Sequence, residues 1–154
     1  LRSLGQPAAG WRTVAAVVDS GAEATVTPPG LSPGRVFESP MQPAGDIYRA
    51  ANGAIIPNLG QQRVGFRTSE GHNCALCFQV AGVERPQISA SQLARSGHRV
   101  EFGPTEGAIV HVSTGRRIKL EKVGGVYLLW MQVRDRAQTP ADPRSPAGFS
   151  RRGQ

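Results

Sequence analysis

Glycine and proline punctuate this sequence along almost its whole length, with 19 Gly and 12 Pro among 154 residues. Both residue types weaken the interior of regular elements and favour turns, so the elements between them must be short. A chain of this length has room for one domain with a hydrophobic core. We therefore expect a single all-β domain, built from short strands joined by many turns.

Short apolar and alternating runs predict about eight strands. Residues 11–18 (Trp-Arg-Thr-Val-Ala-Ala-Val-Val) end in a continuously apolar stretch, which is typical of a strand buried on both faces. Asn52-Gly53 lies between strand-like runs, and Asn-Gly is the strongest short-range signal for a hairpin. The strands predicted after residue 18 are 47–50, 54–56, 62–68, 72–80, 98–102, 108–112, 117–121 and 125–133, with 62–80 forming a second hairpin.

Residues 88–94 show a different pattern, which predicts one short helix. Ser89 or Ser91 can cap its first turn, and Leu93 supplies an apolar side chain. Gly97 can end the helix, because glycine readily adopts the left-handed conformation found at helix C-termini.

The net charge of +7 is unevenly distributed along the chain. Residues 134–154 hold five Arg and two Asp, which accounts for +3 of it, and Phe149 is their one large apolar residue. Such a segment has too little apolar surface to offset the conformational entropy lost on folding. We therefore expect a disordered, basic, Pro-rich tail. Basic residues elsewhere are scattered singly, with few aromatic residues beside them, so we do not expect the body to bind nucleic acid.

The N-terminal residues show no targeting pattern. Residues 1–10 predict a loose leader, which leaves 11–133 as the folded domain. No run approaches the roughly 18 apolar residues of a membrane helix, and no signal-peptide pattern is present. The chain begins at Leu1, so we treat it as a piece of a longer polypeptide that works inside the cell, without a membrane partner.

Two cysteines, Cys74 and Cys77, follow His72 in a predicted strand. A structural zinc site needs four ligands, and this pair has no second pair at a useful spacing. We therefore expect no metal and no cofactor. Positions three apart lie on opposite faces of a strand, so one thiol should face the core and the other should face outward.

An ionisable residue follows the first apolar strand and marks the candidate site. Asp19 precedes Ser20 and Gly21, and a buried carboxylate is costly unless it is paired or has a function. The three residues supply a carboxylate, a hydroxyl that can fix the backbone, and a glycine that allows close approach of another chain. Asp-Ser-Gly also makes ordinary turns, so the surrounding motifs decide between the two interpretations.

Four motifs occur in one order over residues 11–133. They are 17–22 (Val-Val-Asp-Ser-Gly-Ala), 50–53 (Ala-Ala-Asn-Gly) with Pro57 and Gly60, 88–93 (Ile-Ser-Ala-Ser-Gln-Leu) with Gly97, Val100 and Phe102, and 125–129 (Gly-Val-Tyr-Leu-Leu). This arrangement resembles the retropepsin-like aspartic proteases, particularly the protease region of copia-type retrotransposon polyproteins. The resemblance implies a closed β-barrel with one short helix and a flap hairpin, functional as a two-fold homodimer.

The resemblance also implies an aspartic endopeptidase that cleaves extended segments of a polyprotein. Two Asp carboxylates share one proton: one acts as a base toward water, while the protonated one polarises the scissile carbonyl. The sequence contains one Asp-Ser-Gly and no second Asp-Ser/Thr-Gly. The second carboxylate must come from another copy, so Asp19 is expected to meet the partner's Asp19 at the two-fold axis.

Further roles follow from the same resemblance. It implies active-site support by Ser20, Gly21 and Ala22, a substrate-binding flap that includes Ala51, Asn52, Gly53 and Ala54, and a floor that includes Ile88 and Ala90. The flap would close over an extended polypeptide and add main-chain hydrogen bonds to it. The expected location is the cytoplasm or a retroelement particle.

Two other functions remain open at this level. A catalytically inactive module of the same fold would dimerise or bind peptides without turnover. A basic β-barrel that binds nucleic acid would require salt-dependent binding by the body without residues 134–154.

Overall fold

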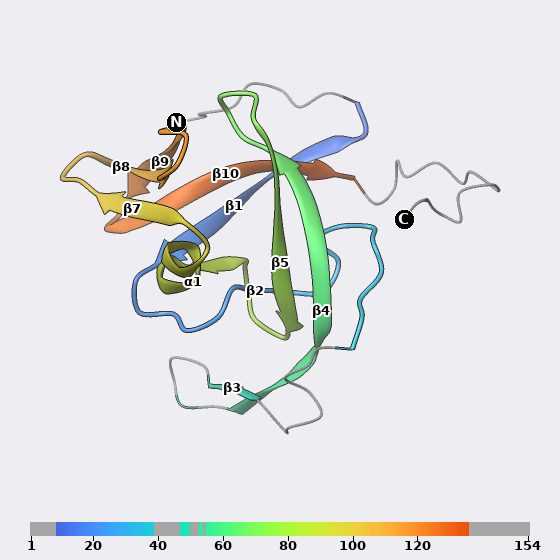
Figure 1. The fold of residues 1–154 in the computed structure, drawn as a ribbon. Coiled ribbons are helices and arrows are strands. Elements are labelled where there is room, and N and C mark those ends of the chain that lie inside the picture. Colours follow the sequence, from blue (N-terminus) through green and yellow to red (C-terminus); the bar gives the residue numbers. More distant parts are fainter. Residues whose placement is uncertain (1–8, 39–46, 50–52, 54, 136–154) are drawn as a thin grey trace.

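The computed structural model describes residues 9–38, 47–49, 53 and 55–135, and these form ten strands and one short helix (Figure 1). The elements are β1 (Trp11–Asp19), β2 (Val26–Thr27), β3 (Ile47–Arg49), β4 (Ile55–Arg67), β5 (Asn73–Ala81), β6 (Gln87–Ser89), α1 (Ala90–Arg95), β7 (His98–Phe102), β8 (Glu106–His111), β9 (Arg117–Val123) and β10 (Val126–Arg134). The predicted all-β class with one short helix is confirmed. Most of the predicted leader and tail, residues 1–8 and 136–154, lies outside the described residues.

The strands form one mixed sheet in the order β3-β4-β5-β2-β6-β1-β10-β9-β8-β7. Strand β1 is central, because it pairs antiparallel with β10 on one side and parallel with β6 on the other. One further pair, Arg67 with Gln132, joins β4 to β10 and links two distant parts of the sheet. The closed β-barrel that the resemblance implies stays a prediction.

The long hairpin of β4 and β5 differs from its predicted form. The sequence suggested two strands separated around Pro57 and Gly60, whereas β4 runs through both residues as one strand of 13 residues. The register shifts between Asn58 and Gly60, and Gly60 has a φ of 136°. A Cβ there would lie 2.6 Å from the carbonyl oxygen of Phe37, so glycine allows the chain before β3 to pair alongside Gln61.

Helix α1 begins where the sequence predicts. Ser89 is the N-cap in an extended conformation, and its side-chain oxygen accepts a hydrogen bond from the backbone N–H of Gln92 at 3.1 Å. Leu93 is buried, and Gly97 follows the helix with a φ of 92°. This short helix packs between β6 and β7, so it connects the centre of the sheet to its edge.

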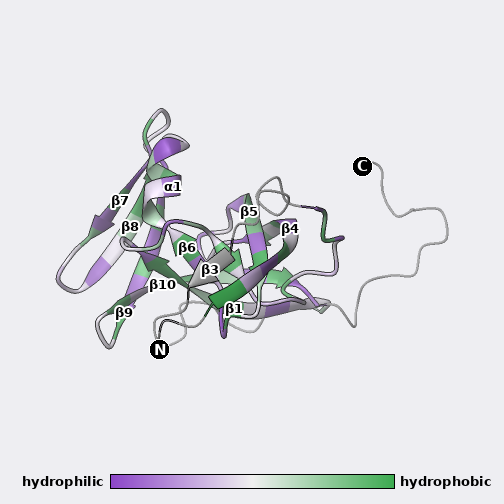
Figure 2. Cartoon of the chain, turned by 90° about the horizontal axis from the view of Figure 1, so that it is seen from below, coloured by the Kyte–Doolittle hydropathy of each residue, from purple (hydrophilic) through white to green (hydrophobic). Residues whose placement is uncertain are grey.

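The hydrophobic core lies where β1, β4, β5 and β10 pack together. Alternation along β4 places Val64 and Phe66 inside, and Phe78 of β5 and Met131 of β10 are fully buried. Figure 2 shows β7, β8 and β9 extending to one side of the remaining strands. Within the described residues, no helix is long and apolar enough to cross a bilayer.

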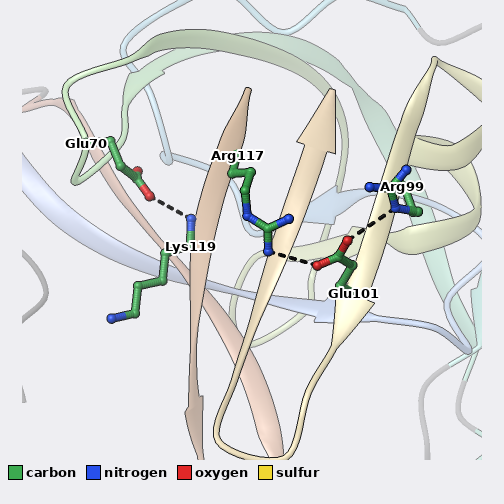
Figure 3. A network of polar contacts seen from close by, with 5 residues as sticks. All are labelled: Glu70, Arg99, Glu101, Arg117 and Lys119. Carbon is green, nitrogen blue, oxygen red and sulfur yellow. Dashed lines mark hydrogen bonds and ion pairs between the residues drawn. The ribbon is translucent and has the colours of Figure 1, made fainter. Parts of the chain in front are cut away.

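Exposed charges connect the strands of that side (Figure 3). The Glu101 carboxylate accepts hydrogen bonds from Arg117 at 2.8 Å and from Arg99 at 3.2 Å. Glu70, in the turn between β4 and β5, accepts a 2.6 Å hydrogen bond from the backbone N–H of Lys119. The turn is thereby attached to the middle of β9.

The ion pairs of Glu101 lead to a titration prediction. Hydrogen bonds from Arg117 first, and from Arg99 second, lower the pKa of the Glu101 carboxyl below its ordinary value. A carboxyl with a lowered folded-state pKa stabilises the fold above its unfolded pKa, and that contribution is lost as pH falls through the folded pKa. In NMR titrations, Arg117→Met should raise the pKa of Glu101 more than Arg99→Met does. Equal shifts would contradict this ranking.

Candidate functional site

Asp19 is the last residue of β1, which lies between β6 and β10 in the sheet. In the parallel pairing of β1 with β6, Val18 lies beside Ile88 and Asp19 lies beside Ser89. Side chains alternate along β1, so Val18 enters the core while Asp19 points to the other face and stays partly exposed. Only Ala16 and Val18 of β1 are buried and its other residues are half-buried, so the expected burial on both faces is wrong: one face packs in the core, and the strand ends in a partly exposed carboxylate.

Two neutral groups hold the Asp19 carboxylate. The backbone N–H of Gly21 donates to Oδ1 at 2.8 Å, and the side-chain amide of Gln87 donates to Oδ2 at 2.6 Å. Both oxygens therefore have a donor, and neither of these donors is a cation. These two hydrogen bonds orient the carboxylate.

The loop after Asp19 is fastened to the start of α1. The buried hydroxyl of Ser89 donates to the carbonyl oxygen of Ala22 at 2.8 Å, and the backbone N–H of Ser89 donates to Thr25 Oγ1 at 3.0 Å. The backbone N–H of Thr25 in turn donates to Gln92 Oε1 at 3.0 Å. These contacts join segments more than sixty residues apart and fix the path of the loop.

The structure brings the predicted support and floor residues to this loop in different ways. Ser20 and Gly21 are exposed, Ala22 is half-buried, and a Cβ on Gly21 would make only ordinary contact, 3.5 Å from Asp19 Oδ1. Ile88 is fully buried in the core, so its side chain lies beneath the site and does not face solvent. Ala90 opens α1 and packs against the core. The support residues thus follow Asp19 directly in the loop, whereas Ile88 and Ala90 pack toward the core.

The two arms of the predicted flap pair as a hairpin. Strand β3 runs antiparallel to β4, with Ile47 opposite Pro57 and Arg49 opposite Ile55. Gly53 is exposed and has a φ of 88°, in the left-handed region that favours glycine. The other proposed flap residues, Ala51, Asn52 and Ala54, lie outside the described residues. Figure 1 shows β3 at the bottom of the view, below α1.

Gln87 is the site residue that sequence reasoning missed. It lies 68 residues after Asp19, in a strand of only three residues that the sequence did not predict. A local signal was present, since Gln87 is a polar residue immediately before the apolar Ile88. Nothing local indicated that this short strand would lie beside β1.

Asp135 and the two thiols do not belong to this site. Asp135 follows β10 at the end that pairs with Trp11, at the opposite end of β1 from Asp19. Cys74 is half-buried against the core, where desolvation raises its pKa, and Cys77 is exposed, which confirms the predicted opposite orientations. In the described part of the chain, no three His, Cys, Asp or Glu side chains gather as a metal ion would require.

Asp19 is thus a partly exposed carboxylate at the end of β1, oriented by two donors and followed by a braced loop. A single carboxylate of this kind can act as a base, but it cannot also supply the acid that peptide hydrolysis requires. Comparisons of the chain with protein-family models, with curated proteins and with solved structures found no match.

Proposed function

We propose that this chain is one subunit of a homodimeric aspartic endopeptidase of the retropepsin type, which cleaves extended segments of a retroelement polyprotein inside the cell. The observation that carries the proposal is the setting of Asp19. Its carboxylate stands at the end of a central strand, partly exposed, and accepts hydrogen bonds from two neutral donors. The proposal adds a second copy of this group to complete the acid and base pair.

In the dimer, two Asp19 carboxylates approach each other across a two-fold axis and share one proton. The ionised carboxylate takes a proton from a water molecule, which attacks the scissile carbonyl carbon. The protonated carboxyl donates to the carbonyl oxygen and so stabilises the charge that develops there. The exposed Ser20 and Gly21 leave the tip of the loop accessible to the partner, in support of this arrangement.

The substrate lies as an extended strand beneath the β3–β4 hairpin, which serves as the flap. An extended peptide can add main-chain hydrogen bonds to a strand edge, and a hairpin can close over it. Ile55, at the turn end of the hairpin, and Leu59, further along β4, are 58% and 51% exposed, so apolar side chains are available along the hairpin. These features favour a polypeptide substrate over a small molecule.

Cleavage of an internally quenched peptide library at mildly acid pH tests the proposal. We expect hydrolysis that is blocked by a statine-containing peptide, because the statine hydroxyl imitates the tetrahedral intermediate. Specific activity should rise with protein concentration as subunits associate. Indifference to the statine peptide would refute the aspartic mechanism. A dimer that binds the peptides without cleaving them would identify an inactive peptide-binding module instead.

A further inference from the structure

We infer that Gln87 is a positioning residue for the catalytic carboxylate, because its side-chain amide sets the orientation of Asp19. The inference rests on the proposed function, since it assigns a role within that reaction. Its basis is the 2.6 Å hydrogen bond from Gln87 Nε2 to Asp19 Oδ2. Neither the Asp-Ser-Gly motif nor the predicted flap and floor includes this residue.

The sheet places Gln87 beside Asp19 with little freedom. Strand β6 lies between β1 and β2, and Gln87 pairs with Val17 on one side and with Val26 on the other. Because side chains alternate, Gln87 shares a face with Val17 and Asp19. Two residues along a strand span about 7 Å, a distance that the long glutamine side chain bridges by leaning along β1.

Hydrogen bonds to both oxygens fix the plane of the carboxylate. The terminal torsion of an aspartate side chain is broad, so one bond alone leaves the carboxylate free to rock. Here Gly21 holds Oδ1 through the backbone and Gln87 holds Oδ2 through a side chain. A proton shared by two carboxylates, and a water molecule between them, require both groups to stay within a fraction of an ångström of one geometry.

The amide suits this task because it is neutral. A lysine or arginine at residue 87 would form an ion pair with the Asp19 carboxylate. The ion pair would make that carboxylate a weaker base. An apolar side chain would leave Oδ2 to solvent and allow the carboxylate to rotate. Glutamine orients the carboxylate without neutralising it.

Gln87 contributes less to the fold than its neighbours do. Ile88, on the opposite face of β6, is fully buried in the core, and Ser89 is fully buried beside the loop. Gln87 itself is half-buried, and the partner of its side-chain amide is the Asp19 carboxylate. A substitution that keeps the length of this side chain should therefore change the site more than the fold.

The test is Gln87→Met, which preserves length and removes the donor, with Gln132→Met on β10 as the matched control. Kinetics use a single peptide chosen from the cleaved library. We expect Gln87→Met to lower kcat between about 10-fold and 100-fold, the effect of losing a hydrogen bond to a charged group, while KM changes less than about threefold. Gln132→Met should leave both constants near those of the unsubstituted protein. Unchanged kcat, or an increase in KM alone, would overturn the positioning role.

A second measurement does not depend on activity. The side-chain amide resonances of Gln87, assigned by their loss in Gln87→Met, should move in Asp19→Asn because the acceptor changes from a carboxylate to an amide. Resonances that stay in place would show that the contact is absent, and the inference would fail. Failure of the proposed function has another signature: the unsubstituted protein would cleave no peptide, whatever the Gln87 resonances do, and the positioning role of Gln87 in catalysis would then be rejected as well.

Discussion

Replacing Asp19 with asparagine is expected to reduce peptide hydrolysis by about 1,000-fold or more, while the fold survives. An asparagine amide can neither accept the proton of the attacking water nor share a proton with a second carboxylate. It has nearly the shape of aspartate, and its oxygen can still accept the 2.8 Å hydrogen bond from the backbone N–H of Gly21. The measurement is kcat on one cleaved peptide, together with the thermal midpoint of unfolding.

A matched charge removal distinguishes catalysis from general electrostatics. Glu23 lies four residues after Asp19 in the same loop and is exposed. Glu23→Gln removes one negative charge near the site, and turnover should stay close to that of the unsubstituted protein because surface substitutions of this kind have small effects. Equal loss in the two variants would contradict a specific role for Asp19, and full activity in Asp19→Asn would eliminate the proposed mechanism.

Replacing Phe78 with alanine is expected to lower the free energy of unfolding by about 3–5 kcal/mol. Phe78 is fully buried in β5, where it packs in the core shared with β1, β4 and β10. The loss combines the free energy of transferring the ring out of water with the cavity that the surrounding strands cannot close. Urea denaturation measures this loss of free energy, and the slope of the transition is compared between the two proteins.

The matched control for this loss is Phe37→Ala. Phe37 is 52% exposed, and its ring lies under the guanidinium of Arg35 at 4.9 Å, an interaction that contributes about 1 kcal/mol or less at such a site. The same chemical change should therefore cost much less at residue 37 than at residue 78. Similar losses at the two positions would mean that burial in this core does not govern stability.

Much of the local structure could be predicted from the sequence. The apolar run before Asp19 identified a strand that ends at a carboxylate, and Ser89 with Gly97 marked the two ends of the helix. The spacing of Cys74 and Cys77 predicted one inward and one outward thiol. Each of these features depends on neighbouring residues alone, through side-chain alternation or helix capping, so a linear pattern contains the information.

The sequence misjudged elements whose strand character comes from their partners. Strand β2 has two residues and β6 has three, too few for any periodic pattern to appear. Pro57 and Gly60 suggested a break between two strands, but β4 continues through both residues. The register shifts next to Gly60, and this shift accommodates the close approach of Phe37. Hydrogen bonds to strands remote in the chain stabilise these segments. The intrinsic strand propensity of their residues does not reveal these hydrogen bonds.

The sequence by itself determined an all-β chain, the strand that ends at Asp19, and the short helix capped by Ser89. Only the tertiary structure decided that β6 lies between β1 and β2, which brings Gln87 to Asp19 across 68 residues of sequence. The physical reason is that alternation and capping act between near neighbours. The choice of which strands lie side by side depends on how the whole core packs, and no short stretch of sequence contains that choice.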